Sequence, residues 1–108
     1  MSFPCSIPAE HQLDLEKGEL HFNINLDFPD IESHFPGQPL VPAFAQLIWA
    51  QYLVSKLDPS DLKGFHSVKF KSPIIPPTNV TVVFKDSSTF EIHSAGKLST
   101  LGKIKRAN

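Results

Sequence analysis

Strict alternation of apolar and polar side chains marks the first regular element of the chain. Across residues 19–26 every second side chain is apolar: Leu20, Phe22, Ile24 and Leu26. Because successive side chains of a strand point to opposite faces, this pattern predicts a strand with one buried face. Similar segments predict four further strands, at residues 64–72, 79–85, 89–93 and 97–105. The short polar turns between the last three suit antiparallel hairpins.

A nearly continuous apolar segment predicts the one long helix, over residues 43–57. Pro42 suits the start of a helix, where a missing N–H loses no hydrogen bond. Asp58 precedes Pro59 and ends the helix, because the residue before a proline avoids the α conformation. Apolar side chains lie on almost every side of this helix, so we expect a sheet to wrap around it.

The order of these elements predicts the fold class. A strand, a long helix and then a meander of strands indicate an α+β domain, in which one long central helix is wrapped by a curved antiparallel sheet. We expect a single domain over residues 1–108, with residues 1–18 an irregular N-terminal segment that has room for one short strand. A domain this small buries a modest core, so association with a second subunit would stabilise it.

Composition narrows the possible functions. A hydrophobic content of 41% indicates a globular domain. A net charge of −1 gives no indication of a protein that binds nucleic acids or membrane surfaces. The single cysteine, Cys5, excludes an internal disulfide, and the histidine spacing does not suit zinc, so we expect no metal. We also expect no cleaved leader, no membrane insertion and a cytoplasmic location.

The long segment before the helix holds the candidate chemistry. Residues 27–42 contain four prolines and one histidine, His34. Loops of this length in compact domains are usually functional, and an unperturbed imidazole, with a pKa of about 6.5, suits a general base. His34 is therefore interpreted as a base at the mouth of an apolar tunnel. Taken alone, the residue favours the alternative of a loop histidine that only caps or forms structural hydrogen bonds, and it is the surrounding motif that favours a functional role.

Three motifs carry a resemblance to a known family. The run His-Phe-Pro-Gly-x-Pro-Leu-x-Pro, residues 34–42, resembles the signature of the hotdog-fold β-hydroxyacyl-[acyl carrier protein] dehydratases. Residues 68–76 resemble a Lys-Phe-x-x-Pro-Val-x-Pro segment of the same family. Residues 46–49, Gln-Leu-Ile-Trp, are similar to the Gln-Leu-x-Trp helix of short dehydratase-like proteins from aryl-polyene gene clusters. The resemblance covers roughly residues 19–104 and implies the hotdog fold.

The resemblance also implies a site. The catalytic histidine of the family corresponds to His34, and its acidic partner, which comes from across the dimer, corresponds to Ile48. Backbone N–H groups at Ala43 and Phe44, at the start of the helix, can stabilise the negative charge that develops on a thioester oxygen. Further positions expected to line the tunnel or its polar parts are Gly37, Gln46, Trp49 and Phe70.

The implied activity is that of a lyase, which dehydrates 3-hydroxyacyl thioesters carried on the phosphopantetheine of an acyl carrier protein, in fatty-acid or polyene synthesis. No cofactor of its own is expected. The partners implied are the carrier protein and a second subunit, in a homodimer or in a heterodimer with an acid-bearing homologue.

Isoleucine at the acid position leaves three alternatives open. The first is an active dehydratase, with His34 acting as base and proton donor or with an acid from elsewhere. The second is a catalytically degenerate subunit of a heteromeric dehydratase. An acyl-thioester hydrolase of the same fold is the third alternative.

Cations gather toward the end of the chain. They are Lys69, Lys71, Lys103, Lys105 and Arg106. They could contact an acidic carrier protein or a phosphopantetheine phosphate, or they could form an ordinary solvated face. The pattern of residues alone does not distinguish these two interpretations.

Overall fold

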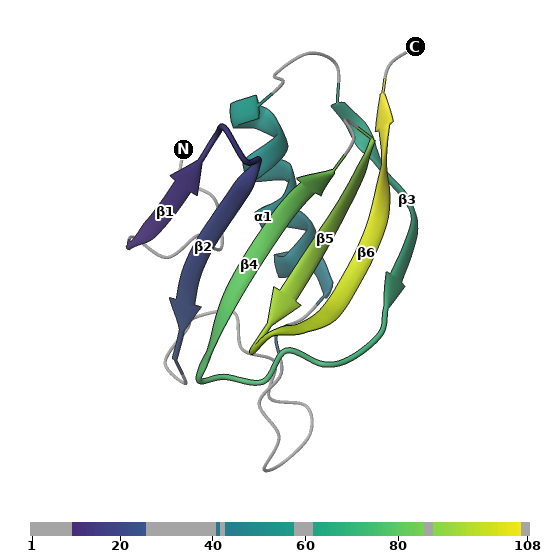
Figure 1. Ribbon diagram of the computed structural model, residues 1–108. Helices are drawn as coiled ribbons and strands as arrows, with labels where there is room; N and C mark the ends of the chain where they lie inside the picture. Colours follow the sequence, from purple (N-terminus) through teal and green to yellow (C-terminus); the bar gives the residue numbers. More distant parts are fainter. Residues whose placement is uncertain (1–9, 26–40, 42, 58–61, 86–87, 107–108) are drawn as a thin grey trace.

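A computed structural model describes residues 10–25, 41, 43–57, 62–85 and 88–106 of the chain. These ranges contain six strands and one helix (Figure 1). In chain order they are β1 (His11–Asp14), β2 (Glu19–Ile24), α1 (Ala43–Leu57), β3 (Leu62–Phe70), β4 (Thr78–Lys85), β5 (Thr89–Ser94) and β6 (Lys97–Arg106). The predicted helix is confirmed at both ends, and the five predicted strands are confirmed to within two residues at each end. The additional strand, β1, lies within the N-terminal segment.

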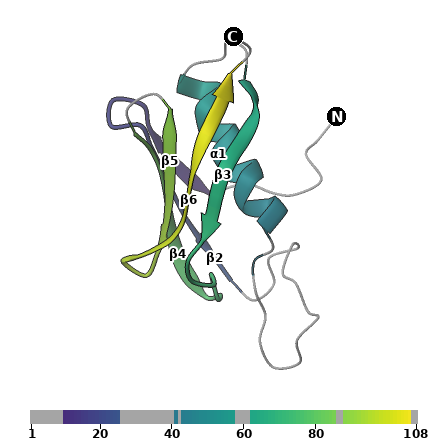
Figure 2. The same ribbon diagram turned by 90° about the vertical axis from the view of Figure 1, so that its right-hand side faces the viewer.

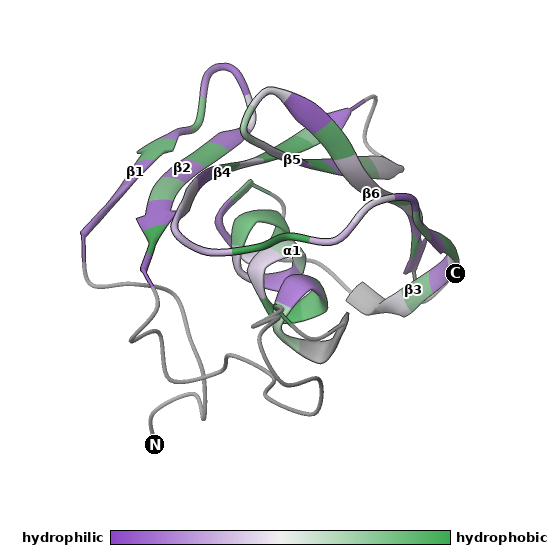
Figure 3. Cartoon of the chain, turned by 90° about the horizontal axis from the view of Figure 1, so that it is seen from below, coloured by the Kyte–Doolittle hydropathy of each residue, from purple (hydrophilic) through white to green (hydrophobic). Residues whose placement is uncertain are grey.

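The described strands form one antiparallel sheet in the order β1-β2-β4-β5-β6-β3. β3 follows the helix in the chain but lies at the edge of the sheet, beside the last strand. β1 forms the opposite edge, so the sheet is open. The side view and the view from below show the sheet curving around α1, which lies on its concave side (Figures 2 and 3). The expected α+β architecture is confirmed.

A tight turn joins β5 to β6. Ser94 pairs with Lys97, which leaves Ala95 and Gly96 as the two turn residues, with φ of 51° and 80°. Two successive residues with positive φ match the natural twist of a two-residue hairpin, and glycine adopts such a conformation without strain. The Ser-Ala-Gly segment therefore fixes the register of the last hairpin.

The core fills the space between α1 and the concave face of the sheet. The alternation in β2 places Phe22 inward, where its ring meets the Trp49 ring edge-to-face with centroids 4.8 Å apart. Trp49 is completely buried. The other buried apolar residues are Leu20, Ile24, Val41, Ala45, Ala50, Leu53, Val54, Ile74, Val80, Val82, Phe90, Ile92 and Ile104. Apolar residues of the strands thus alternate toward the helix, as the sequence pattern requires.

The sheet covers one side of α1 only. Gln51, Ser55 and Lys56 are exposed, and Leu47 and Ile48 are partly buried. Within the described residues the helix is therefore less enclosed than its apolar composition predicts. The physical reason is that an open sheet of six strands bends around one side of a helix and does not reach the other side.

The absence of a side chain at Gly102 allows β6 to lie close to the Phe90 ring. Gly102 is buried opposite Phe90, and a Cβ built at this glycine would lie 2.9 Å from two atoms of the Phe90 ring and 3.0 Å from Val68 Cγ2. Real Cβ atoms do not approach other atoms so closely. The Phe90 ring also meets Phe65 edge-to-face, with centroids 5.2 Å apart. Gly102 therefore makes room for the side chains of Phe90 and Val68.

We predict that Gly102→Ala lowers the free energy of unfolding by about 1–3 kcal/mol, because the new methyl group overpacks the core. The measurement is urea unfolding of the wild-type and variant chains. In a Phe90→Leu background the loss should be smaller, because leucine removes the ring atoms that the methyl group meets.

Gly96→Ala is the matched control, since a Cβ there meets nothing within 4 Å and only the backbone is strained. Its cost, roughly 1 kcal/mol, should be the same in both backgrounds. Equal losses at Gly102 with and without the Phe90 ring would contradict the packing argument.

Candidate functional site

The N-terminal end of α1 is the first component of the candidate site. Ala43 and Phe44 are its first two residues. Backbone N–H groups in the first turn of a helix have no acceptor within the helix, and the end of the helix carries a partial positive charge. Such an end can stabilise a developing oxyanion. Ala43 and Phe44 thus lie at the first turn of α1, and their role in stabilising an oxyanion stays a prediction.

A buried amide next to this helix end joins three segments of the chain. Gln46 is 4% exposed, and its Oε1 accepts a short hydrogen bond from Thr100 Oγ1 in β6. Its Nε2 donates to the carbonyl oxygen of Val41 over 3.4 Å. The Val41 N–H in turn donates to the carbonyl oxygen of Ile74 over 3.1 Å. The residue that leads into the helix is therefore held by both the helix and the β3–β4 connection.

Two serines extend this polar region. Ser94 and Ser99 are 8% and 0% exposed, and their hydroxyl oxygens lie 2.8 Å apart. The β5–β6 register shifts here, because Ile92 pairs with Thr100 while His93 pairs with Leu98. A register shift of this kind changes the direction in which side chains point. Ser99 and Thr100 are neighbours in the strand, and both are fully buried. We call Gln46, Ser94, Ser99 and Thr100 the polar end of the core.

Every buried polar side-chain atom in the described ranges has a hydrogen-bond partner. The polar end of the core therefore consists of two satisfied side-chain pairs, Gln46 with Thr100 and Ser94 with Ser99, rather than a set of orphaned groups. A hollow of about 300 Å³ adjoins it, and Ser94 belongs to both. The lining residues are Ser72, Pro73, Ile75, Thr78, Ser94, Ala95 and Lys97.

A larger groove, of about 1240 Å³, lies over β1, β2 and β4. It contains His21, whose Nε2 lies 2.9 Å from Glu19 Oε1 and whose Nδ1 lies 3.2 Å from Thr81 Oγ1. These side chains alternate with the buried Phe22, so they are on the face of the sheet away from the helix. We place the candidate site at the helix end instead, because that is where N–H donors and a buried polar network come together.

The other predicted site residues have different positions. His34 and Gly37 lie outside the described residues, so their predicted roles stay predictions. Trp49 belongs to the core, and Phe70, at the end of β3, is 49% exposed. Their predicted role in lining a tunnel is not tested by these positions.

Ile48 lies on the side of α1 that the sheet leaves uncovered. It is partly buried, and helical spacing puts it in line with Gln51 and Ser55, both exposed. The neighbouring Trp49, by contrast, is fully buried. Within the described residues, position 48 therefore lies on the side of α1 that the sheet does not cover.

Sequence reasoning missed Ser94, Ser99 and Thr100. A signal was present, because the alternation of β6 breaks at residues 98–101, where Leu-Ser-Thr-Leu places two polar residues side by side. A bulge in a strand produces such a break. The pairing of Thr100 with Gln46, 54 residues away in sequence, needs the folded structure.

In the described ranges there is no group of three or more His, Cys, Asp or Glu side chains able to hold a metal ion. None of the helices described is long and apolar enough to cross a bilayer.

Comparison with solved structures identifies the class of fold. An uncharacterized protein from Erwinia carotovora subsp. atroseptica matches with a TM-score of 0.63 and 26% identity, over 81% of this chain and 79% of that one. The dehydratase heterocomplex ApeI:P from Xenorhabdus doucetiae matches with a TM-score of 0.63 and 23% identity, over 93% and 90%. The domain has the α+β hotdog fold.

Comparison of sequences then identifies the family. The ApeI-like family, described as ApeI dehydratase, matches residues 10–103, and the chain belongs to this family. It is also 35% identical over 82 residues to the 3-hydroxyacyl-[acyl-carrier-protein] dehydratase FabZ of Klebsiella pneumoniae subsp. pneumoniae and of Salmonella arizonae. These matches cover 63% of the chain and 54% of each relative, so the chain spans about half the length of the curated relatives it matches.

We predict that Gln46→Leu lowers the free energy of unfolding by about 1–3 kcal/mol, because it leaves the buried Thr100 hydroxyl and the Val41 carbonyl without their partner. Urea unfolding measures the change. Thr100→Val should be costly for the same reason, and the double variant should lose less than the sum of the two single losses.

Gln51→Leu, on the exposed side of the same helix, is the control and should change stability by no more than about 0.5 kcal/mol. Additive losses in the double variant, or equal losses at Gln46 and Gln51, would show that the buried amide does not bridge helix and sheet.

Proposed function

We propose that this chain takes part in the dehydration of 3-hydroxyacyl thioesters carried on the phosphopantetheine of an acyl carrier protein, in fatty-acid or aryl-polyene synthesis. The observation that carries the proposal is the match to the ApeI dehydratase family over residues 10–103. The names of the FabZ relatives and the intact His-Phe-Pro-Gly run at residues 34–37 support the same reaction. The reaction needs no resident cofactor.

The reaction assigns a role to each candidate residue. A base removes the proton on the carbon next to the thioester carbonyl, and the electron pair of that bond moves into a developing enolate oxygen. In our proposal His34 is the base, and the backbone N–H groups of Ala43 and Phe44 stabilise the enolate oxygen. The enolate then re-forms the carbonyl as the carbon–carbon double bond forms and the hydroxyl on the next carbon leaves.

The leaving hydroxyl needs a proton, and position 48 offers only a hydrocarbon side chain. We propose that a homologous subunit, which bears the acid, supplies this proton within a heterodimer. Two observations support this: Ile48 is on the uncovered side of α1, and the ApeI:P protein of Xenorhabdus doucetiae is described as a heterocomplex. In a homodimer His34 would have to return the proton that it had taken.

A second candidate function rests on the same isoleucine. The chain would be a catalytically degenerate subunit that completes the binding tunnel of an active partner. The two candidates differ in whether His34 is needed for turnover by the assembled dimer. We further propose a cytoplasmic location, which the single cysteine and the carrier-bound substrate support.

We predict that His34→Ala lowers kcat/KM by about 10²–10⁴-fold, the usual contribution of a general base. The assay uses the chain with its co-expressed homologous subunit and follows conversion of a 3-hydroxyacyl carrier substrate to the enoyl product by mass spectrometry. His93→Ala is the matched control, because His93 lies in β5 and pairs with Glu91 at 2.9 Å. Full turnover by the folded His34→Ala assembly would favour the degenerate subunit. Release of free thiol instead of enoyl product would identify a hydrolase.

We predict that Ile48→Glu raises dehydration by the chain alone at least about tenfold, because a carboxylic acid at this position can protonate the leaving hydroxyl. The partly buried position on the uncovered helix side should tolerate the change. Ile48→Gln has the same size without the acid and should give no gain. No gain from a folded Ile48→Glu variant would argue that the site does not have the geometry of the dehydratase family.

A further inference from the structure

Both ends of the Gln46 side-chain amide are bound inside the protein. Gln46 is the fourth residue of α1 and is 4% exposed. Its amide oxygen accepts a hydrogen bond from Thr100, and its amide nitrogen donates one to the Val41 carbonyl. A side chain that is buried and bound in this way does not contact a substrate. Any contribution of Gln46 to a reaction therefore acts through the groups that it holds.

The hydrogen bond from Gln46 to Val41 spans the start of the helix. The donor belongs to the fourth residue of α1 and the acceptor lies two residues before its first, so the bond closes over residues 41–46. Ala43 and Phe44 lie inside this closed segment, and their backbone N–H groups have no acceptor within the helix. The direction of these two N–H groups therefore depends on how the ends of the segment are held.

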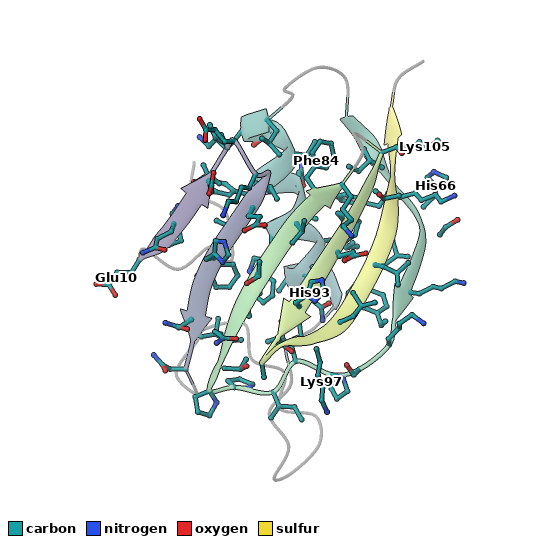
Figure 4. All side chains as sticks on the ribbon, viewed as in Figure 1. Glu10, His66, Phe84, His93, Lys97 and Lys105 are labelled. Carbon is teal, nitrogen blue, oxygen red and sulfur yellow. The ribbon has the colours of Figure 1, made fainter. Side chains whose placement is uncertain are left out.

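Both ends of the closed segment are bound to other parts of the fold. At one end Thr100 in β6 binds Gln46. At the other end the Val41 N–H donates to Ile74, in the connection between β3 and β4. The start of α1 lies at the same end of the molecule as the β5–β6 turn, where Figure 4 labels Lys97. The helix start is thus held at two points by segments that are distant from it in sequence.

The proposed reaction is sensitive to the direction of the N–H groups in this segment. A developing oxyanion is stabilised by donors that lie about 2.7–3.1 Å from its position in the transition state. Donors that the fold holds in place beforehand need no rearrangement during the reaction, and a displacement of about 1 Å can lower the rate roughly 10²-fold. A helix start held at two points meets this requirement better than one held only by the helix itself.

We propose that Gln46 and Thr100 are positioning residues for the dehydration, and that their hydrogen bond keeps the backbone N–H groups at the start of α1 directed at the thioester oxygen. The inference rests on the function proposed above and deepens it, because it assigns a role to two side chains that do not touch the reacting atoms. Loss of the bond should weaken binding of the transition state and leave binding of the substrate almost unchanged.

Two substitutions at position 100 separate the hydrogen bond from the packing. Thr100→Val keeps the shape of the side chain without the donor, whereas Thr100→Ser keeps the donor. In the assembly with the co-expressed homologous subunit, Thr100→Val should lower kcat at least about tenfold and change KM less than about twofold. Thr100→Ser should stay within about threefold of the wild-type kcat. Gln46→Leu should lower kcat at least as much as Thr100→Val, because it removes both hydrogen bonds of the amide.

Gly102→Ala is the control for a loss of stability alone. Position 102 lies in the same strand as Thr100, and the atoms nearest to the added methyl group belong to Phe90 and Val68. At a temperature at which every variant is folded, its kcat should equal that of the wild type. An equal fall of kcat in Gly102→Ala and Thr100→Val would overturn the inference, and so would equal kcat values for Thr100→Val and Thr100→Ser.

Hydrogen exchange at the Val41 amide tests the anchoring without any turnover. This N–H is bound to the Ile74 carbonyl over 3.1 Å, and release of Gln46 should let it open more often. Relative to the amide of Val82 in the central strand β4, it should exchange at least about tenfold faster in Thr100→Val than in Thr100→Ser or Gly102→Ala.

The two measurements separate this inference from the proposed function. Unchanged relative exchange at Val41 would overturn the anchoring, and faster exchange with an unchanged kcat would overturn the positioning role. A folded wild-type assembly that dehydrates no 3-hydroxyacyl carrier substrate would overturn the proposed function and the positioning role with it, while exchange at Val41 would still decide whether Thr100 and Gln46 anchor the helix start.

Discussion

The structure depends on a buried amide that connects helix to sheet. Gln46 takes a hydrogen bond from Thr100 on β6 and gives one to Val41, whose own N–H is bound to Ile74. A polar group in a core is costly unless its partners are in place, and a satisfied network then specifies one arrangement among many of similar packing. The start of α1, where N–H donors are available, is thereby held in one position relative to β6 and the β3–β4 connection.

Two surfaces that the described residues leave uncovered, one side of α1 and the β3 edge, differ in their side chains. The open side of α1 bears Ile48 among exposed polar residues, whereas the β3 edge bears cations and Phe70. The first surface has one apolar side chain among polar ones, and the second has positive charge beside a half-exposed aromatic ring. A small domain that leaves both a helix side and a strand edge uncovered gains stability from association.

The elements of the fold were predictable because short-range patterns determine them. The alternation in β2 and the segment 43–57, bounded by proline, located a strand and the helix. The position of β3 at the sheet edge and the pairing of Gln46 with Thr100 were not predictable, because both depend on contacts between residues far apart in sequence. For the site, the motif supplied His34, Ile48 and the helix start, while the surroundings of Gln46 required the packed structure. The incomplete cover of α1 was missed because composition reports how apolar a helix is, not how far a sheet extends around it.

The anchoring of Val41 has a consequence for substitutions in the preceding segment. Ile24 is held by pairing with β4 and Val41 by its bonds to Gln46 and Ile74, so the described ends of this segment rest on contacts outside it. A substitution among the sixteen residues between Ile24 and Val41 therefore leaves these bonds in place, and the start of α1 keeps its anchor on the sheet.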